Sequence, residues 1–191
     1  DALINRREFL RNLGVIGAGT LLSISPWLSV FSEVVETSGE KCRLAIIGTG
    51  SRGRFLMSFL LQNPKVEIVA LCDIYQPSME KALNLVREAK VYTDYRKVLE
   101  NKTVDAVLVA TPLNLHCQIV LDAFDAGKHV FCEKSIGFTM EECFRIYKKH
   151  ISTGKVFFTG QQRLFDPRYI KAMEMIHAGT FGAVSYTHLR A

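Results

Sequence analysis

The chain has 191 residues, which is room for one full-sized domain and a small remainder, because a typical domain takes about 100 to 200 residues. Hydrophobic residues make up 48% of the chain and charged residues 23%, as in ordinary globular proteins. The net charge is +5, but the lysines and arginines are scattered and form no basic run. These values speak against two complete domains and against a nucleic-acid partner.

The first forty residues have the pattern of an export signal. Arg6 and Arg7 are followed by a stretch over residues 13–22 that is almost wholly apolar or glycine. Glycines and Pro26 interrupt it, and it is shorter than the roughly 20 apolar residues of a membrane span. We predict a twin-arginine signal and linker over residues 1–40, with the twin-arginine export machinery as partner and the periplasm as location. An uncleaved signal would instead leave a membrane anchor.

The cysteines are odd in number, and no two of them have C-x-x-C spacing. Several stand inside apolar runs, where a thiol behaves as a small hydrophobe. We therefore expect buried, reduced thiols and no metal site. The five are Cys42, Cys72, Cys117, Cys132 and Cys143.

From residue 41 onward, short apolar runs alternate with longer segments of helical periodicity. Runs such as residues 104–110 are apolar almost throughout, which is typical of parallel strands covered by helices on both faces. The expected fold is α/β, a doubly wound parallel sheet of the Rossmann type. The predicted strands are residues 43–48, 66–72, 104–110, 129–132 and 156–159. The predicted helices are residues 55–61, 77–89, 95–100, 115–126, 140–152 and 167–178.

Several helix ends carry recognisable signals. Thr139 and Glu142 have the spacing of a capping box, and Asp166 followed by Pro167 is typical of an N-cap and the first helical residue. Left-handed C-terminal caps are expected at Gly127, Gly154 and Gly179.

A glycine-rich turn follows the first strand and carries the strongest binding signal. Its G-x-G-x-x-G pattern is weak alone, but here it comes directly after a strand and opens a helix. The first glycine then makes the tight turn, the second lets the backbone approach a pyrophosphate, and the third allows close helix packing. The helix N-terminus would hold the phosphates, with Arg52 and Arg54 either adding charge or lying in solvent. The turn is Gly48, Thr49, Gly50, Ser51, Arg52 and Gly53.

Asp73 ends the second strand, twenty positions after Gly53. An acid at this distance accepts hydrogen bonds from the adenine ribose hydroxyls, although a helix cap is the alternative. A carboxylate there would repel a ribose 2'-phosphate. We therefore expect NAD as cofactor, with NADP less favoured.

Two further strand ends add polar residues to the same edge of the sheet. Ligands of open α/β sheets bind beyond the carboxyl ends of the strands, where the strand order reverses. His116 could carry a proton there, or it could be a cap or packing residue. Lys134 could bind a sugar hydroxyl and transfer a proton, or it could form a surface ion pair with its neighbour. The residues expected at this crevice are Thr111, Pro112, Asn114, His116, Glu133 and Lys134.

In this order and spacing, the glycine turn, Asp73, the Ala110-Thr111-Pro112 run with His116, and Glu133-Lys134 resemble the Gfo/Idh/MocA oxidoreductases. The resemblance spans about residues 42–182. It implies an N-terminal Rossmann domain, a second α+β domain with an open sheet, and NAD(P)-dependent chemistry on sugars or polyols.

The resemblance also assigns roles to individual residues. Lys134 matches the lysine of the family's Glu-Lys-Pro motif, which assists proton transfer beside the nicotinamide, and Ser135 stands in place of the proline. Arg163 resembles a residue in the segment that leaves the nucleotide domain, and we count it among the cofactor-binding residues. The predicted catalytic residues are Lys134 and His116.

The expected domain order is a signal, then the Rossmann domain over residues 41–162, then the start of a truncated substrate domain over residues 163–191. Residues 185–191 read either as a strand of that domain or as a non-native tail. The leading hypothesis is an NAD-dependent oxidoreductase acting on a sugar or polyol. The alternatives are an NAD-dependent glycoside hydrolase of the N-acetylgalactosaminidase type and a nucleotide-bound sensor without turnover. A homo-oligomer would form through the second domain.

Overall fold

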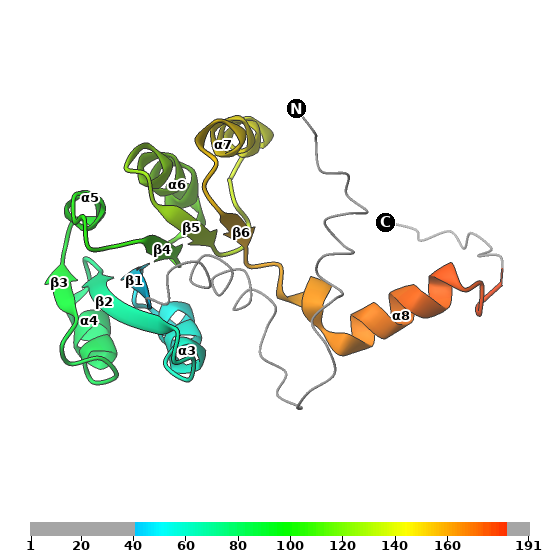
Figure 1. The fold of residues 1–191 in the computed structure, drawn as a ribbon, viewed down its shortest axis with the longest axis horizontal. Helices are drawn as coiled ribbons and strands as arrows, with labels where there is room; N and C mark the ends of the chain where they lie inside the picture. The colour runs from blue at the N-terminus through cyan, green and yellow to red at the C-terminus, as the bar shows by residue number, and fades with distance from the viewer. Residues whose placement is uncertain (1–40, 183–191) are drawn as a thin grey trace.

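A computed structural model describes residues 41–182, whose centre is one parallel sheet (Figure 1). The strand order is β3-β2-β1-β4-β5-β6, and every neighbouring pair is parallel. The predicted export signal and the residues after 182 lie outside the described part. The strands are β1 (Cys42–Ile47), β2 (Val66–Cys72), β3 (Lys90–Tyr92), β4 (Ala106–Val109), β5 (His129–Cys132) and β6 (Phe157–Thr159).

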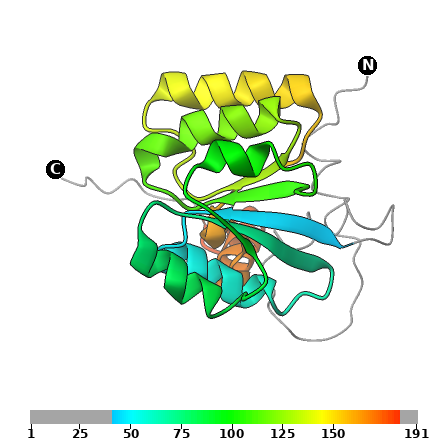
Figure 2. The same cartoon turned by 90° about the vertical axis from the view of Figure 1, so that its left-hand side faces the viewer.

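Helices cover both faces of this sheet, as the predicted doubly wound fold requires (Figure 2). One face carries α3 (Ser51–Leu60) and α4 (Gln76–Leu83). The other carries α5 (Tyr95–Leu99), α6 (His116–Asp125) and α7 (Met140–Thr153). Beyond β6, a short η2 (Gln162–Phe165) leads into α8 (Pro167–His177), which extends away from the sheet in Figure 1.

The central strand β4 shows why the sheet forms two separate cores. All four of its residues are buried. Ala106 and Leu108 pack with Leu56 and Met57 of α3, whereas Val107 and Val109 pack on the opposite face with the helices there. A strand with no polar face is stable only between two layers of helix, so the apolar run predicted this burial correctly.

The structure corrects the prediction between residues 77 and 92. The helix predicted over residues 77–89 ends at Leu83, and β3 follows as a strand that the sequence prediction missed. This edge strand has three residues, of which Lys90 and Val91 are exposed. The strand pairs with β2 at the edge of the sheet and is little buried, so its residues show no apolar alternation.

The first helix also differs, because α3 begins at Ser51 rather than at residue 55. Arg52 and Gly53 therefore belong to its first turn. The other helix-end predictions are confirmed: Thr139 and Glu142 form the capping box, and Asp166 caps α8. Gly127, Gly154 and Gly179 all have positive φ at helix ends.

The cysteines agree with the expectation of reduced thiols. All five are free, and all except Cys143 are buried. Burial raises the pKa of Cys72 to about 12 and also raises that of Cys132, so these thiols are neutral at pH 7. Within residues 41–182, no helix is both long and apolar enough to cross a membrane.

Candidate functional site

The site lies at the carboxyl ends of β1, β4 and β5, where the chain reverses its direction of winding. β1 and β4 are neighbours in the sheet, and the loops that follow them lead to helices on opposite faces, α3 on one and α6 on the other. The glycine turn follows β1, the loop from Ala110 to His116 follows β4, and Glu133 and Lys134 follow β5.

Two glycines of the turn are required by close backbone packing. Gly48 has φ +95°, and a Cβ there would lie 2.6 Å from the carbonyl carbon of Ala110. A Cβ on Gly53 would lie 2.0 Å from the carbonyl oxygen of Gly48. The first and third glycines therefore have the turn and packing roles that the motif predicts.

The middle glycine has a different environment. A Cβ on Gly50 would meet no described atom within 4 Å. Gly50 is also the N-cap of α3, where no described side chain caps the helix and no acid occupies the first turn. The free N–H groups and positive end of α3 thus face open space, which suits an anion such as a phosphate.

Asp73 anchors the turn from the end of β2. Its Oδ2 accepts hydrogen bonds from the backbone N–H of Thr49 at 2.7 Å and from the Thr49 hydroxyl at 3.0 Å. Its Oδ1 accepts one from the N–H of Tyr75 at 2.9 Å. Each oxygen of a carboxylate has about two acceptor positions, so the side chain keeps capacity for a ligand hydroxyl.

Arg52 and Glu133 connect the two sides of the crevice. Arg52 Nη2 lies 2.6 Å from Glu133 Oε1, and its Nε donates to the same oxygen at 2.7 Å. The Glu133 side chain is only 8% exposed, against 38% for Arg52. The ion pair therefore neutralises a buried carboxylate, and it differs from the surface Glu133–Lys134 pair that the sequence suggested as an alternative.

His116 is buried and bridges two loops through its ring. Its Nδ1 lies 2.7 Å from the carbonyl oxygen of Ser135, and its Nε2 lies 2.9 Å from that of Thr111. The Thr111 Oγ1 atom is itself buried and has no hydrogen-bond partner among the described residues. A buried hydroxyl without a partner is costly, which points to a ligand contact at this position.

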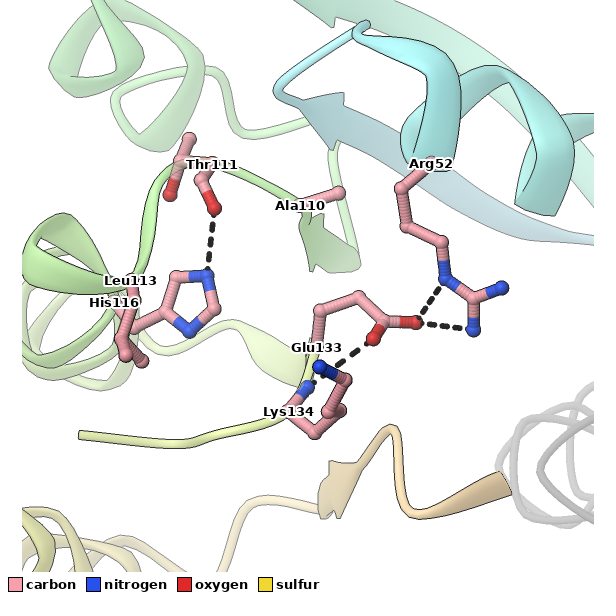
Figure 3. Close-up of a pocket in the computed structure, with 7 residues that line it drawn as sticks. All are labelled: Arg52, Ala110, Thr111, Leu113, His116, Glu133 and Lys134. Atoms are coloured by element: carbon pink, nitrogen blue, oxygen red, sulfur yellow. Dashed lines mark hydrogen bonds and ion pairs between the residues drawn. The ribbon is translucent and has the colours of Figure 1, made fainter. Parts of the chain in front are cut away.

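Arg52, Glu133 and His116 help to surround a cavity of about 330 Å³ (Figure 3). Lys134 is exposed at its edge, and its backbone N–H donates to Glu133 Oε2 at 3.2 Å. The peptide bond from Lys134 to Ser135 is cis. The cavity is lined by Arg52, Ala110, Thr111, Leu113, His116, Glu133 and Lys134.

Apart from the glycine turn and Asp73, three predicted site residues are not part of the cavity lining. Pro112 and Asn114 are exposed and do not belong to the cavity lining, although they flank it on the loop after β4. Arg163 lies on η2, where its guanidinium donates to the Tyr169 hydroxyl and stacks over that ring. The structure therefore does not bring Arg163 together with the glycine turn.

Gly160 and Ile74 also lie at strand ends near the site and are not predicted from the sequence. A Cβ on Gly160 would lie 2.9 Å from the carboxyl carbon of Glu133, so only glycine leaves room for that buried acid. Its one sequence signal is its place directly after the last strand. Ile74 follows Asp73 and is 89% exposed.

A parallel sheet of this order, with a glycine turn after β1 and an acid at the end of β2, defines a dinucleotide-binding Rossmann domain. The model of the oxidoreductase family with an NAD-binding Rossmann fold, Gfo/Idh/MocA, matches residues 42–161. The chain belongs to this family, and NAD is its cofactor.

Curated relatives include proteins named for glycoside hydrolysis. A glycosyl hydrolase family 109 protein from Stenotrophomonas maltophilia is 32% identical, over 98% of this chain and 42% of the relative. An alpha-N-acetylgalactosaminidase from Shewanella oneidensis is 27% identical, over 94% of this chain and 44% of the relative. The chain thus spans less than half the length of these relatives.

Similar solved structures include dehydrogenases. Myo-inositol 2-dehydrogenase from Lactobacillus plantarum is 29% identical with a TM-score of 0.72, over 77% of this chain and 44% of that one. Scyllo-inositol dehydrogenase from Lactobacillus casei, solved with NAD(H) and scyllo-inositol, has a TM-score of 0.70 at 24% identity, over 75% of this chain and 43% of that one. At 24% identity, the likeness to scyllo-inositol dehydrogenase concerns the fold alone.

Proposed function

We propose that the whole protein is an NAD-dependent enzyme acting on a sugar, and that its net reaction is hydrolysis of a glycoside with transient oxidation of a ring carbon. The observation that carries this proposal is the position of Lys134 at the cavity that Arg52 of the nucleotide turn also lines. A proton-transfer group beside a dinucleotide site is what oxidation of a sugar hydroxyl requires.

The residues of the crevice fit the cofactor. The uncapped N-terminus of α3 and the open space at Gly50 suit the pyrophosphate. The partnerless hydroxyl of Thr111 suits a polar group of the ligand. At the end of β2, Asp73 suits a free ribose 2'-hydroxyl, which supports a preference for NAD over NADP.

When bound in the crevice, NAD would supply a reversible acceptor for the hydride of the sugar carbon. In this proposal Lys134 accepts the hydroxyl proton as the ring carbon is oxidised and donates it back on reduction. Between these two steps the bond to the aglycone breaks, and one water adds its hydroxyl to the sugar and its proton to the aglycone. Arg52 and Glu133 keep the loop after β5 against the turn after β1, which holds Lys134 at the crevice. The remaining substrate contacts belong to the second domain expected after residue 163.

Hydrolysis is favoured over net oxidation by the curated relatives named above. From the twin-arginine pattern we propose a periplasmic location. This location also favours hydrolysis over net oxidation, because in hydrolysis the hydride returns to the same nicotinamide in each turnover and no further NAD is needed. Net oxidation of a sugar or polyol is the second candidate, and the likeness to myo-inositol 2-dehydrogenase supports it.

Incubation of the full-length protein with an aryl α-N-acetylgalactosaminide tests the proposal. We expect release of the aglycone without net accumulation of NADH, and loss of that release in Lys134→Ala with NAD affinity preserved. NADH accumulation from free sugars or inositols, with no aglycone released, would establish the second candidate instead. Binding of NAD without either reaction would support the sensor hypothesis.

A further inference from the structure

The imidazole of His116 is held between two groups that can only accept hydrogen bonds. Its Nδ1 faces the Ser135 carbonyl at 2.7 Å and its Nε2 faces the Thr111 carbonyl at 2.9 Å. A neutral imidazole has one N–H and one bare nitrogen, so it can donate to only one of these two oxygens. The other nitrogen would then oppose a carbonyl lone pair at hydrogen-bond distance.

We propose that His116 is an imidazolium that donates to both carbonyls and acts as a positioning residue rather than as a proton carrier. It ties the loop after β4 to the loop after β5, at the residue that follows Lys134. The part concerning Lys134 rests on the proposed function, whereas the protonation state of the ring does not.

The two carbonyl oxygens are what would stabilise a cation at this buried position. His116 is 2% exposed, so burial disfavours the charged ring, and two charge-assisted hydrogen bonds offset that cost. The charged side chains that line the same cavity are Arg52, Glu133 and Lys134. Arg52 and Glu133 pair with one another, and the Lys134 side chain is on the exposed rim.

The same geometry argues against proton transfer to substrate. Neither ring nitrogen is free to face a ligand in the cavity, because both are directed at backbone carbonyls. If His116 gave up a proton, one of the two loop contacts would be lost. Its contribution to the reaction therefore acts through the placement of Lys134.

Nitrogen-15 NMR of the histidine rings tests the protonation state directly. The 191-residue chain contains five histidines, and the difference spectrum between wild type and His116→Gln assigns this ring. We expect both ring nitrogens of His116 to carry protons at pH 7, with two one-bond N–H correlations. A single N–H and one bare nitrogen would overturn the proposal. Because the protonation state is read from the wild-type ring, loss of enzyme activity in the variant does not affect it.

Kinetics of the full-length protein test the positioning role. In His116→Gln we expect kcat to fall by up to roughly a hundredfold, as for a displaced catalytic group, with both limbs of the pH–rate profile retained. Loss of one limb would identify His116 as a proton carrier and refute the assignment, as would an unchanged kcat. His177→Gln on the exposed face of α8 is the matched control and should leave kcat and the profile unchanged.

Discussion

Thr49 donates two hydrogen bonds to one oxygen of Asp73, from its backbone at 2.7 Å and from its hydroxyl at 3.0 Å. Thr49 is completely buried, although it lies in the middle of the glycine turn. The end of β2 therefore fixes the conformation of the glycine turn. Asp73, the acid expected to select the cofactor, also shapes the loop expected to bind it.

Replacing Asp73 by Asn should weaken NAD binding by at least about tenfold, because the one amide oxygen can accept from Thr49 or from Tyr75 but not from both, and the NH2 then faces a donor. Titration calorimetry with NAD and NADP measures this change, and we expect the preference for NAD to decrease. Asp94→Ala, which removes a comparable N-cap bond at α5, is the control and should affect stability only. Unchanged NAD affinity in Asp73→Asn would refute the role of Asp73.

Gly50→Ala should separate binding from folding. The backbone has φ −58°, which any residue adopts, and the new methyl group would meet no described atom within 4 Å. Unfolding free energy should change by less than about 0.5 kcal/mol, while NAD affinity falls at least tenfold because the methyl group occupies the place of a phosphate. Gly53→Ala should fail to fold, because its Cβ would lie 2.0 Å from the carbonyl oxygen of Gly48. Full NAD affinity in Gly50→Ala would contradict the placement of the pyrophosphate.

Thr111→Val tests whether the buried hydroxyl contacts the cofactor. Since this oxygen lacks a partner in the described structure, its removal should leave stability unchanged or raise it by up to about 1 kcal/mol. NAD affinity should fall roughly fivefold to tenfold if the hydroxyl binds the ligand, a loss equal to one hydrogen bond. A variant that loses stability but binds NAD normally would show that the hydroxyl has only a structural role.

A double-mutant cycle on Arg52 and Glu133 should be non-additive. Arg52→Gln leaves the nearly buried Glu133 carboxylate without its partner and should cost about 1 to 3 kcal/mol. Adding Glu133→Gln should recover most of this loss, as measured by urea unfolding. Arg96→Gln, whose pair with Asp94 is exposed, is the control and should cost almost nothing. Additive losses would mean that the ion pair does not stabilise the crevice.

Stability should fall in acid partly through Asp105. Burial alone would raise the pKa of this carboxyl, but the hydrogen bonds and charge of Arg43 outweigh it and lower the pKa below its usual value. The ion pair therefore contributes above the unfolded-state pKa, and the contribution is lost as pH falls through the lower folded-state value. Asp105→Asn should reduce stability at pH 7 but have little effect near pH 2. Equal effects at both pH values would contradict this linkage.

The features that the sequence predicted correctly are those that depend on residues close together in the chain. The buried strands, the capping box at Thr139 and the left-handed glycines depend on residues within one element, and the structure has them as predicted. Edge strand β3 depends on pairing with β2, so a local pattern could not reveal it. The start of α3 depends on the turn that Asp73 anchors, which is likewise a distant contact.

The sequence by itself determined the alternating α/β fold, the glycine turn and the strand ends where Asp73, Glu133 and Lys134 would appear. The apolar periodicity of each element and the positions that require glycine can be read from neighbouring residues. These two signals were enough to predict the fold and the turn. Only the tertiary structure decided that Arg52 pairs with Glu133, that His116 spans two carbonyls, that Gly160 makes room for a buried acid, and that Arg163 lies against Tyr169. Each of these depends on the distance between loops that are far apart in the chain, and the packing of the whole sheet sets that distance.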